Sequence, residues 1–140
     1  MKSIFKGRTG AYQAINLIIA GVIILIFIYS GIFNTSENNY PLKCVHEQLS
    51  GMSCPSCGLS RSFSEMVRFN VDTARDFNHY GPRVFLFFVF QLVLRISILI
   101  YLRRNPGSIK IISGADIIIS SVAFLFCFSQ FIEYTLRLIF

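Results

Sequence analysis

The stretch AINLIIAGVIILIFIYSGIF, residues 14–33, contains no charged side chain. A helix rises about 1.5 Å per residue, so about 20 apolar residues cross a hydrocarbon layer of roughly 30 Å. The apolar core of a cleaved signal peptide is only about 7–15 residues long, and no small-residue cleavage site follows this stretch. We therefore expect residues 14–33 to form an uncleaved transmembrane helix.

Two further stretches of the same kind follow. They are PRVFLFFVFQLVLRISILIYL (residues 82–102) and IISGADIIISSVAFLFCFSQFI (residues 111–132), joined through a short Asn-Pro-Gly turn at residues 105–107. Such a turn predicts an antiparallel hairpin. Of the 140 residues, 54% are hydrophobic and 14% are charged, whereas a soluble domain has about 25% charged residues. We expect an all-α membrane protein with three transmembrane helices and a single membrane domain over residues 1–140.

Basic residues predict how the chain is oriented. Short flanks rich in Lys and Arg stay on the cytoplasmic side. Six basic residues, and no acidic ones, flank the cytoplasmic ends of the three spans in this assignment, namely Lys2, Lys6, Arg8, Arg103, Arg104 and Lys110. The N-terminus is then cytoplasmic and the loop of residues 34–81 is extracytoplasmic. The net charge of +6 is a topology signal, and without a basic groove it does not indicate nucleic-acid binding.

Residues 60–78, within this loop, have apolar side chains at helical spacing and charged ones between them. The pattern predicts one or two short amphipathic helices that lie at the membrane surface or pack on the ends of the spans. Ser62 with Glu65 fits a capping box, and Asp72 or Thr73 is a candidate cap for a second helix.

The same loop holds three of the four cysteines, within a Cys-Pro-x-Cys-Gly turn and ten residues before it. Cys44, Cys54 and Cys57, with His46 as a fourth ligand, have the chemistry of a tetrahedral zinc site. A disulfide between Cys44 and one of the other two is an alternative outside the cytoplasm. A cysteine pair before a helix also fits thiol exchange, because the helix N-terminus stabilises a thiolate. The residues leave these three alternatives open.

The segment CVHEQLSGMSCPSCGLSRSFSEMVRFN, residues 44–70, resembles the core of the bacterial membrane-protein family called domain of unknown function 2752 (DUF2752). The resemblance rests on an upstream cysteine, a glycine, and then Cys-Pro-x-Cys-Gly-Leu-Ser-Arg. In this chain the matching positions are Cys44, Gly51, Cys54, Pro55, Cys57, Gly58, Leu59, Ser60 and Arg61. The resemblance implies a bacterial inner-membrane protein and brings no activity with it.

Two ionisable residues lie inside the predicted spans. Arg95 lies seven residues before the cytoplasmic end of the second span, and Asp116 lies six residues after Lys110. Both are therefore about 10 Å from that end, on antiparallel neighbours, and we expect them to pair. A buried charge in a span indicates pairing or a functional path. Two further pairs are expected from depth, Gln91 with Ser120 and Arg83 with Glu133.

The sequence has no triad of nucleophile and base, no phosphate loop and no helical pair of zinc-binding histidines. We expect a non-enzymatic accessory or scaffold subunit whose extracytoplasmic cap is held by zinc or a disulfide. Its expected partners are the lipid bilayer and other proteins of a membrane complex, and zinc is the candidate cofactor. The alternative is a membrane thiol–disulfide or quinone-linked redox protein that uses Cys54 and Cys57.

Overall fold

The computed structural model describes residues 8–33 and 56–139, which are helical apart from short turns and caps. Within these residues, three helices are long and apolar enough to cross a membrane, and two short helices lie between the first and second of them. The elements are α1 (Arg8–Ile32), α3 (Leu59–Val67), α4 (Val71–Phe77), α5 (Gly81–Arg104), the 3-10 turn η2 (Pro106–Ser108) and α6 (Ile109–Ile139). The predicted fold class is confirmed.

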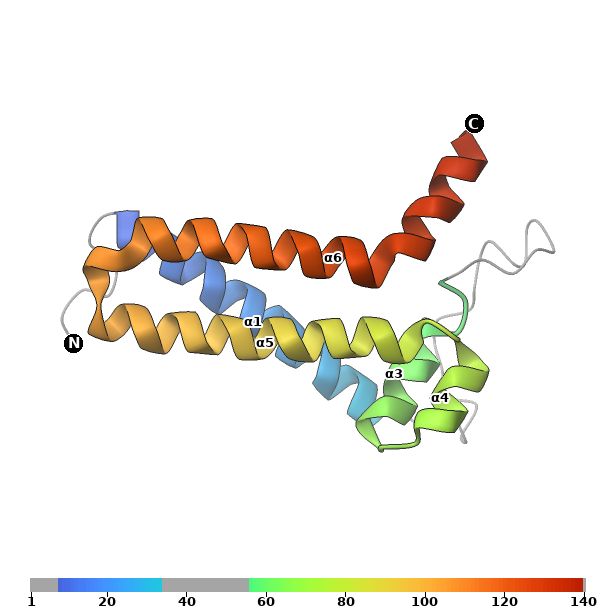
Figure 1. The fold of residues 1–140 in the computed structure, drawn as a ribbon. Helices are drawn as coiled ribbons and strands as arrows, with labels where there is room; N and C mark the ends of the chain where they lie inside the picture. The colour runs from blue at the N-terminus through green and yellow to red at the C-terminus, as the bar shows by residue number, and fades with distance from the viewer. Residues whose placement is uncertain (1–7, 34–55, 140) are drawn as a thin grey trace.

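The long helices form the body of the molecule (Figure 1). Helices α5 and α6 run antiparallel beside each other from the η2 turn, and α1 crosses them. Helix α1 packs chiefly on α5, and the short helices α3 and α4 pack on each other and on the first part of α5. Helix α3 also contacts α1, so the short helices form a cap at the end of the bundle where α1 ends and α5 begins.

Burial in this bundle follows the rule for a chain that is dissolved in lipid. Many large aliphatic side chains of the long helices point outward, including Ile18, Leu25 and Ile117. Several of the most buried side chains are polar, such as Asn16 at 0% exposure. A lipid tail is as apolar as leucine, so apolar side chains gain little by packing inside, whereas polar side chains need protein partners. The outward apolar surface therefore indicates contact with the bilayer.

The start of α3 differs from the prediction. The helix begins at Leu59, and its N-cap is Gly58, whose φ of 76° lies in the left-handed region that glycine adopts readily. The capping box predicted from Ser62 and Glu65 is wrong, because both residues lie inside the helix and are buried. The carboxylate of Glu65 instead accepts a hydrogen bond from Asn70 Nδ2 at 2.9 Å.

Helix α4 begins at Val71 with Asn70 as its N-cap, so the caps predicted at Asp72 and Thr73 are wrong by two or three residues. The turn from α3 into α4 passes through Phe69, which has a φ of 64° and is 91% exposed. A non-glycine residue in this region of φ carries a cost of about 1–2 kcal/mol. The turn is thus strained at an exposed aromatic side chain.

Helix α6 is longer than the predicted span of residues 111–132. It covers 31 residues, which is about 46 Å of helix and more than a hydrocarbon layer requires. Toward its C-terminal end it bends away from α5 (Figure 1). In this part Ser129 and Thr135 donate hydrogen bonds to the backbone carbonyls of Phe126 and Phe131, an arrangement that often bends helices.

Candidate functional site

The structure brings Arg95 and Asp116 together inside the bundle. Arg95 Nη1 lies 2.6 Å from Asp116 Oδ2, and both side chains are almost fully buried. Arg95 lies on α5 eleven residues before the η2 turn and Asp116 lies on α6 eight residues after it, and their contact is the one that the sequence led us to expect. The guanidinium and the carboxylate neutralise each other where water does not reach them, which makes both charges tolerable at this depth.

The other predicted pair on these helices, Gln91 and Ser120, also contacts Arg95. Arg95 Nη2 donates to Gln91 Oε1 at 2.9 Å and to Ser120 Oγ at 2.8 Å. Ser120 Oγ in turn donates to Asp116 Oδ1 at 3.1 Å. Gln91 and Ser120 thus surround the ion pair on the side away from the η2 turn, and both terminal nitrogens of the guanidinium have acceptors.

Helix α1 supplies two residues that the sequence analysis did not identify. Tyr12 donates its hydroxyl to Asp116 Oδ2 at 2.6 Å, and Asn16 Oδ1 accepts from Arg95 Nη1 at 2.9 Å. Asn16 Nδ2 is itself bound to the Tyr12 carbonyl at 2.9 Å. The polar cluster, defined as Tyr12, Asn16, Gln91, Arg95, Asp116 and Ser120, therefore joins all three long helices.

This polar cluster can do one thing by its geometry alone, which is to fix the register of the helices. Each hydrogen bond in it depends on the rotation and depth of two helices, and a shift of either helix leaves a buried polar group without a partner. In an apolar medium that loss is costly because no water replaces the missing partner. Helices α1 and α6 have few contacts with each other, since both pack mainly on α5. The Tyr12–Asp116 hydrogen bond is therefore the main polar contact between these two helices.

The pair predicted at the other end of these helices is wrong. The Arg83 guanidinium carbon lies 4.5 Å from the centre of the Phe126 ring, a cation–π contact. Glu133 pairs with Arg137 at 2.6 Å, one turn further along its own helix. A residue four positions away on the same helix is always within reach, and this local partner is the one that Glu133 contacts.

The second candidate site is the junction between the Cys-Gly turn and the start of α5. Asn78 Nδ2 donates to the Cys57 carbonyl at 2.8 Å, and Asn78 Oδ1 accepts from the backbone N–H of Tyr80 at 2.9 Å. One buried side chain thus ties the turn before α3 to the turn before α5. A Cβ atom at Gly58 would collide with the carbonyl of Phe77 at the end of α4. The glycine of the motif is therefore required both for its φ and for its close approach to α4.

A second close approach lies beside the first. Gly81 is the first residue of α5, and a Cβ atom there would collide with the side chain of Ser62 on α3. Ser62 is fully buried, and no hydrogen-bond partner is described for its Oγ. Pro82 follows in the first turn of α5, where its missing N–H has no cost. Small residues thus let α3 lie directly against the start of the second span.

The end of α1 is held to α3 by a charged cap. Arg68 donates to the carbonyl of Gly31 at 3.0 Å and to that of Phe33 at 3.4 Å. The Ser64 hydroxyl donates to the Ser30 carbonyl at 2.9 Å and also to Phe33. The last carbonyls of a helix have no partners within it and carry partial negative charge, so a guanidinium at this end satisfies them. This contact was not predicted from the sequence.

The predicted cysteine site is described only in part. Cys57 lies half-buried in the turn that precedes α3, and Arg61 lies over the Phe77 ring at 6.0 Å. The fourth cysteine, Cys127, lies half-buried on α6. The other predicted site residues, Cys44, His46, Gly51, Cys54 and Pro55, lie outside the described residues. A zinc site or a disulfide at Cys44, Cys54 and Cys57 therefore stays a prediction, although three thiolates and one imidazole are a donor set that suits zinc.

Comparison with known proteins adds a family and no activity. No curated protein and no solved structure matches the chain significantly. The model of one family, described as "Protein of unknown function (DUF2752)", matches residues 44–92, about a third of the chain. The matched segment contains α3, α4 and the first half of α5, which is the region that carries the close approaches at Gly58 and Gly81. The match confirms the resemblance found in the sequence, and residues 44–92 of this membrane protein are similar to the DUF2752 family.

Proposed function

We propose that this chain is a non-enzymatic accessory or scaffold subunit of a bacterial inner membrane, with a cap that faces away from the cytoplasm. The observation that carries the proposal is that the segment matched by the family model is attached to two of the long helices. Its described residues hold α3 and α4 against the ends of two spans. Arg68 binds a carbonyl at the end of α1, Asn78 binds the Cys-Gly turn, and Gly81 lets α3 lie close to the start of α5. Such a double attachment suits a rigid platform.

The strained turn supports a surface for a protein partner. Phe69 is 91% exposed and has a positive φ. Both features cost free energy in the protein without its partner, one through the exposed apolar ring and one through backbone strain. An exposed large apolar side chain beside Val71, which is also exposed, gains free energy when a partner covers it. We infer that the partner contacts the cap at the turn between α3 and α4.

The cysteines of the proposed cap hold the loop in one state. A structural zinc or disulfide stabilises a loop that lacks a core of its own. The competing proposal is thiol exchange by Cys54 and Cys57, which is favoured by the position of Cys57 just before the nine-residue helix α3. A structural site has one composition at all times, whereas an exchange pair alternates between thiol and disulfide.

One experiment tests the scaffold proposal against the redox alternative. The protein is purified in mild detergent as the wild type, as Phe69→Gly, and with the control substitution Asp76→Ala at another exposed position of the cap. We expect a partner in fixed ratio with the wild type and the control, and its loss from Phe69→Gly although that variant folds at least as stably. Zinc content and the thiol count should be constant. A mixture of thiol and disulfide forms, with an unchanged partner in Phe69→Gly, would favour the redox protein.

A further inference from the structure

Three cations lie together where α5 is joined to α6. Arg103 and Arg104 are the last residues of α5, and Lys110 lies in the first turn of α6. All three residues are exposed, and the short η2 turn between them contacts both helices. These three residues, called the basic turn below, therefore share one end of the antiparallel pair, opposite the cap (Figure 1).

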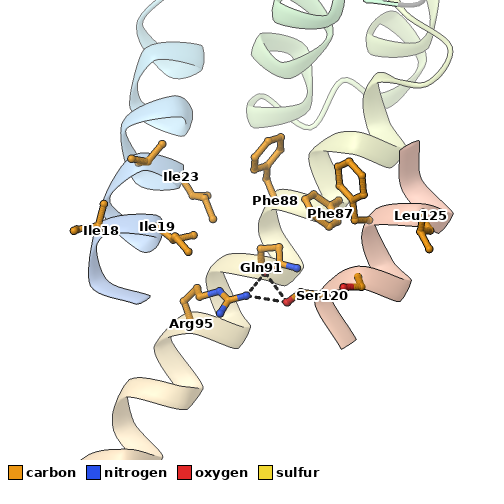
Figure 2. A pocket seen from close by; sticks show the side chains of 12 residues that line it. Ile18, Ile19, Ile23, Phe87, Phe88, Gln91, Arg95, Ser120 and Leu125 are labelled. Carbon is orange, nitrogen blue, oxygen red and sulfur yellow. Dashed lines mark hydrogen bonds between the residues drawn. The ribbon is translucent and has the colours of Figure 1, made fainter. Parts of the chain in front are cut away.

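The basic turn has no counter-charge in the part of the protein that the structure describes. None of its side chains forms an ion pair there, and residues 96–115 contain no Asp or Glu. The next carboxylate along the chain, Asp116, is buried and already paired with Arg95 at 2.6 Å. Arg95 is the contrast, because Gln91 and Ser120 also bind it inside the bundle (Figure 2). The basic turn instead presents three positive charges to its surroundings.

The length of α5 places the basic turn at the membrane surface. The helix has 24 residues, which is about 36 Å of helix against a hydrocarbon layer of roughly 30 Å. Its end at Arg104 therefore lies close to the border between the hydrocarbon and the headgroups. Long basic side chains at such a border extend into the headgroup layer, which is where the lipid phosphates are.

Exposed apolar side chains lie directly beside the cations in the chain. Ile100 and Tyr101 precede them on α5 with 53% and 46% exposure, and Ile111 follows them on α6 with 79% exposure. A lipid matches this arrangement with both of its parts, since its phosphate meets the cations and its acyl chains meet the apolar side chains. A soluble polyanion, such as RNA or an acidic protein, matches the charge alone. The combination favours a lipid.

We propose that the basic turn is a binding site for anionic phospholipids. The phosphodiester of a lipid such as phosphatidylglycerol accepts hydrogen bonds from Arg103 and Arg104 and pairs with the Lys110 ammonium, while its acyl chains lie against Ile100 and Ile111. A role of these cations in orienting the chain ends with insertion, whereas their attraction for anionic lipid persists. The proposal does not depend on the scaffold function, on the cysteines or on which leaflet the turn faces.

The test measures lipid selectivity around the full chain, reconstituted in phosphatidylcholine bilayers. The probes are phosphatidylglycerol and phosphatidylcholine with a spin label on one acyl chain, and electron paramagnetic resonance gives the fraction of each that the protein immobilises. One variant carries Arg103→Gln and Arg104→Gln, and a second carries Lys110→Gln. The matched control carries Arg75→Gln and Arg137→Gln, which remove the same charge from two exposed residues of α4 and the end of α6.

We expect the wild type and the control to prefer phosphatidylglycerol. Each cation removed from the basic turn should lower the association constant of that lipid by up to about fivefold. A further variant with Arg103→Lys and Arg104→Lys should keep the preference because it keeps the charge, and the Lys110→Gln result stands independently if the double glutamine variant folds poorly. High salt should weaken the preference.

Equal association of the two lipids with the wild type would overturn the site. An equal loss in the control and in the double glutamine variant would overturn its location, since net charge alone would then explain the preference. A preference that high salt leaves unchanged would overturn the role of the three charges.

Discussion

The guanidinium of Arg68, the C-cap of α3, lies 3.0 Å from the carbonyl oxygen of Gly31, in the last turn of α1. The segment between these helices is long, yet its two ends are joined by a charge-assisted hydrogen bond at the end of the first span. The same guanidinium also binds the carbonyl of Phe33 at 3.4 Å and that of Ser64 at 2.9 Å. The cap is thus attached to the bundle through a helix terminus.

Arg68→Ala should lower the free energy of unfolding by about 1–3 kcal/mol, because it leaves the last carbonyls of α1 without a charged donor. The matched control is Arg75→Ala, since Arg75 is exposed on α4, and its effect should stay within about 0.5 kcal/mol. Unfolding by SDS in mixed micelles, followed by circular dichroism, measures both. Equal stabilities of the two variants would show that the cap on α1 contributes nothing.

Arg95→Leu and Asp116→Asn should each destabilise the protein by about 3–5 kcal/mol, because either change leaves one buried charge unpaired. The double variant should regain part of this loss. The comparison is the exposed pair of Glu133 and Arg137, for which Glu133→Gln should cost less than about 0.5 kcal/mol. The same unfolding experiment gives the coupling energy. Strictly additive losses in the double variant would mean that the two charges do not interact.

Gly58→Ala should destabilise the protein strongly, by more than about 2 kcal/mol, since the new Cβ atom adds a strained φ to a collision with the Phe77 backbone. Gly114→Ala is the matched control. Gly114 lies inside α6 with open space around it, so alanine should stabilise the helix there by up to about 1 kcal/mol. Thermal unfolding in detergent distinguishes the two. A mild Gly58→Ala variant would contradict the close packing of the motif turn.

Reporter fusions test the orientation. Basic flanks at the N-terminus and around the η2 turn predict that both are cytoplasmic. A fusion after Ser36 should therefore report the outside and a fusion after Pro106 the cytoplasm. If the Pro106 fusion reports the outside, the cysteines face a reducing compartment, where a structural disulfide does not persist.

The three spans and the Arg95–Asp116 contact could be predicted from sequence because both depend on simple quantities. Apolar length decides whether a helix can cross the membrane, and a charge inside a span requires a partner at the same depth. Tyr12 and Asn16 gave no such signal. They lie near the first end of the predicted span, where polar residues are common, and their role depends on the rotation of α1 about its axis.

The structure of the cap was predicted less well, for a different physical reason. A capping box at Ser62 and Glu65 is a local rule, but the N-cap of α3 is Gly58, four residues earlier, in a turn that Asn78 holds through the Cys57 carbonyl, 21 residues away in the chain. Likewise, Glu133 was expected to pair across helices with Arg83, yet a partner one turn away is always closer. Contacts of this kind depend on the tertiary arrangement, which no local pattern contains.

We propose that the cysteines hold the cap in place, and serine replacements test this role. Cys44→Ser, Cys54→Ser and Cys57→Ser are compared by the rate at which an external protease cleaves the loop, beside a non-reducing gel. We expect cleavage to be faster than in the wild type, to a similar extent in all three variants, and no adducts. An intact loop in Cys44→Ser, with the single-cysteine variants captured in mixed disulfides with another protein, would contradict it and establish thiol exchange.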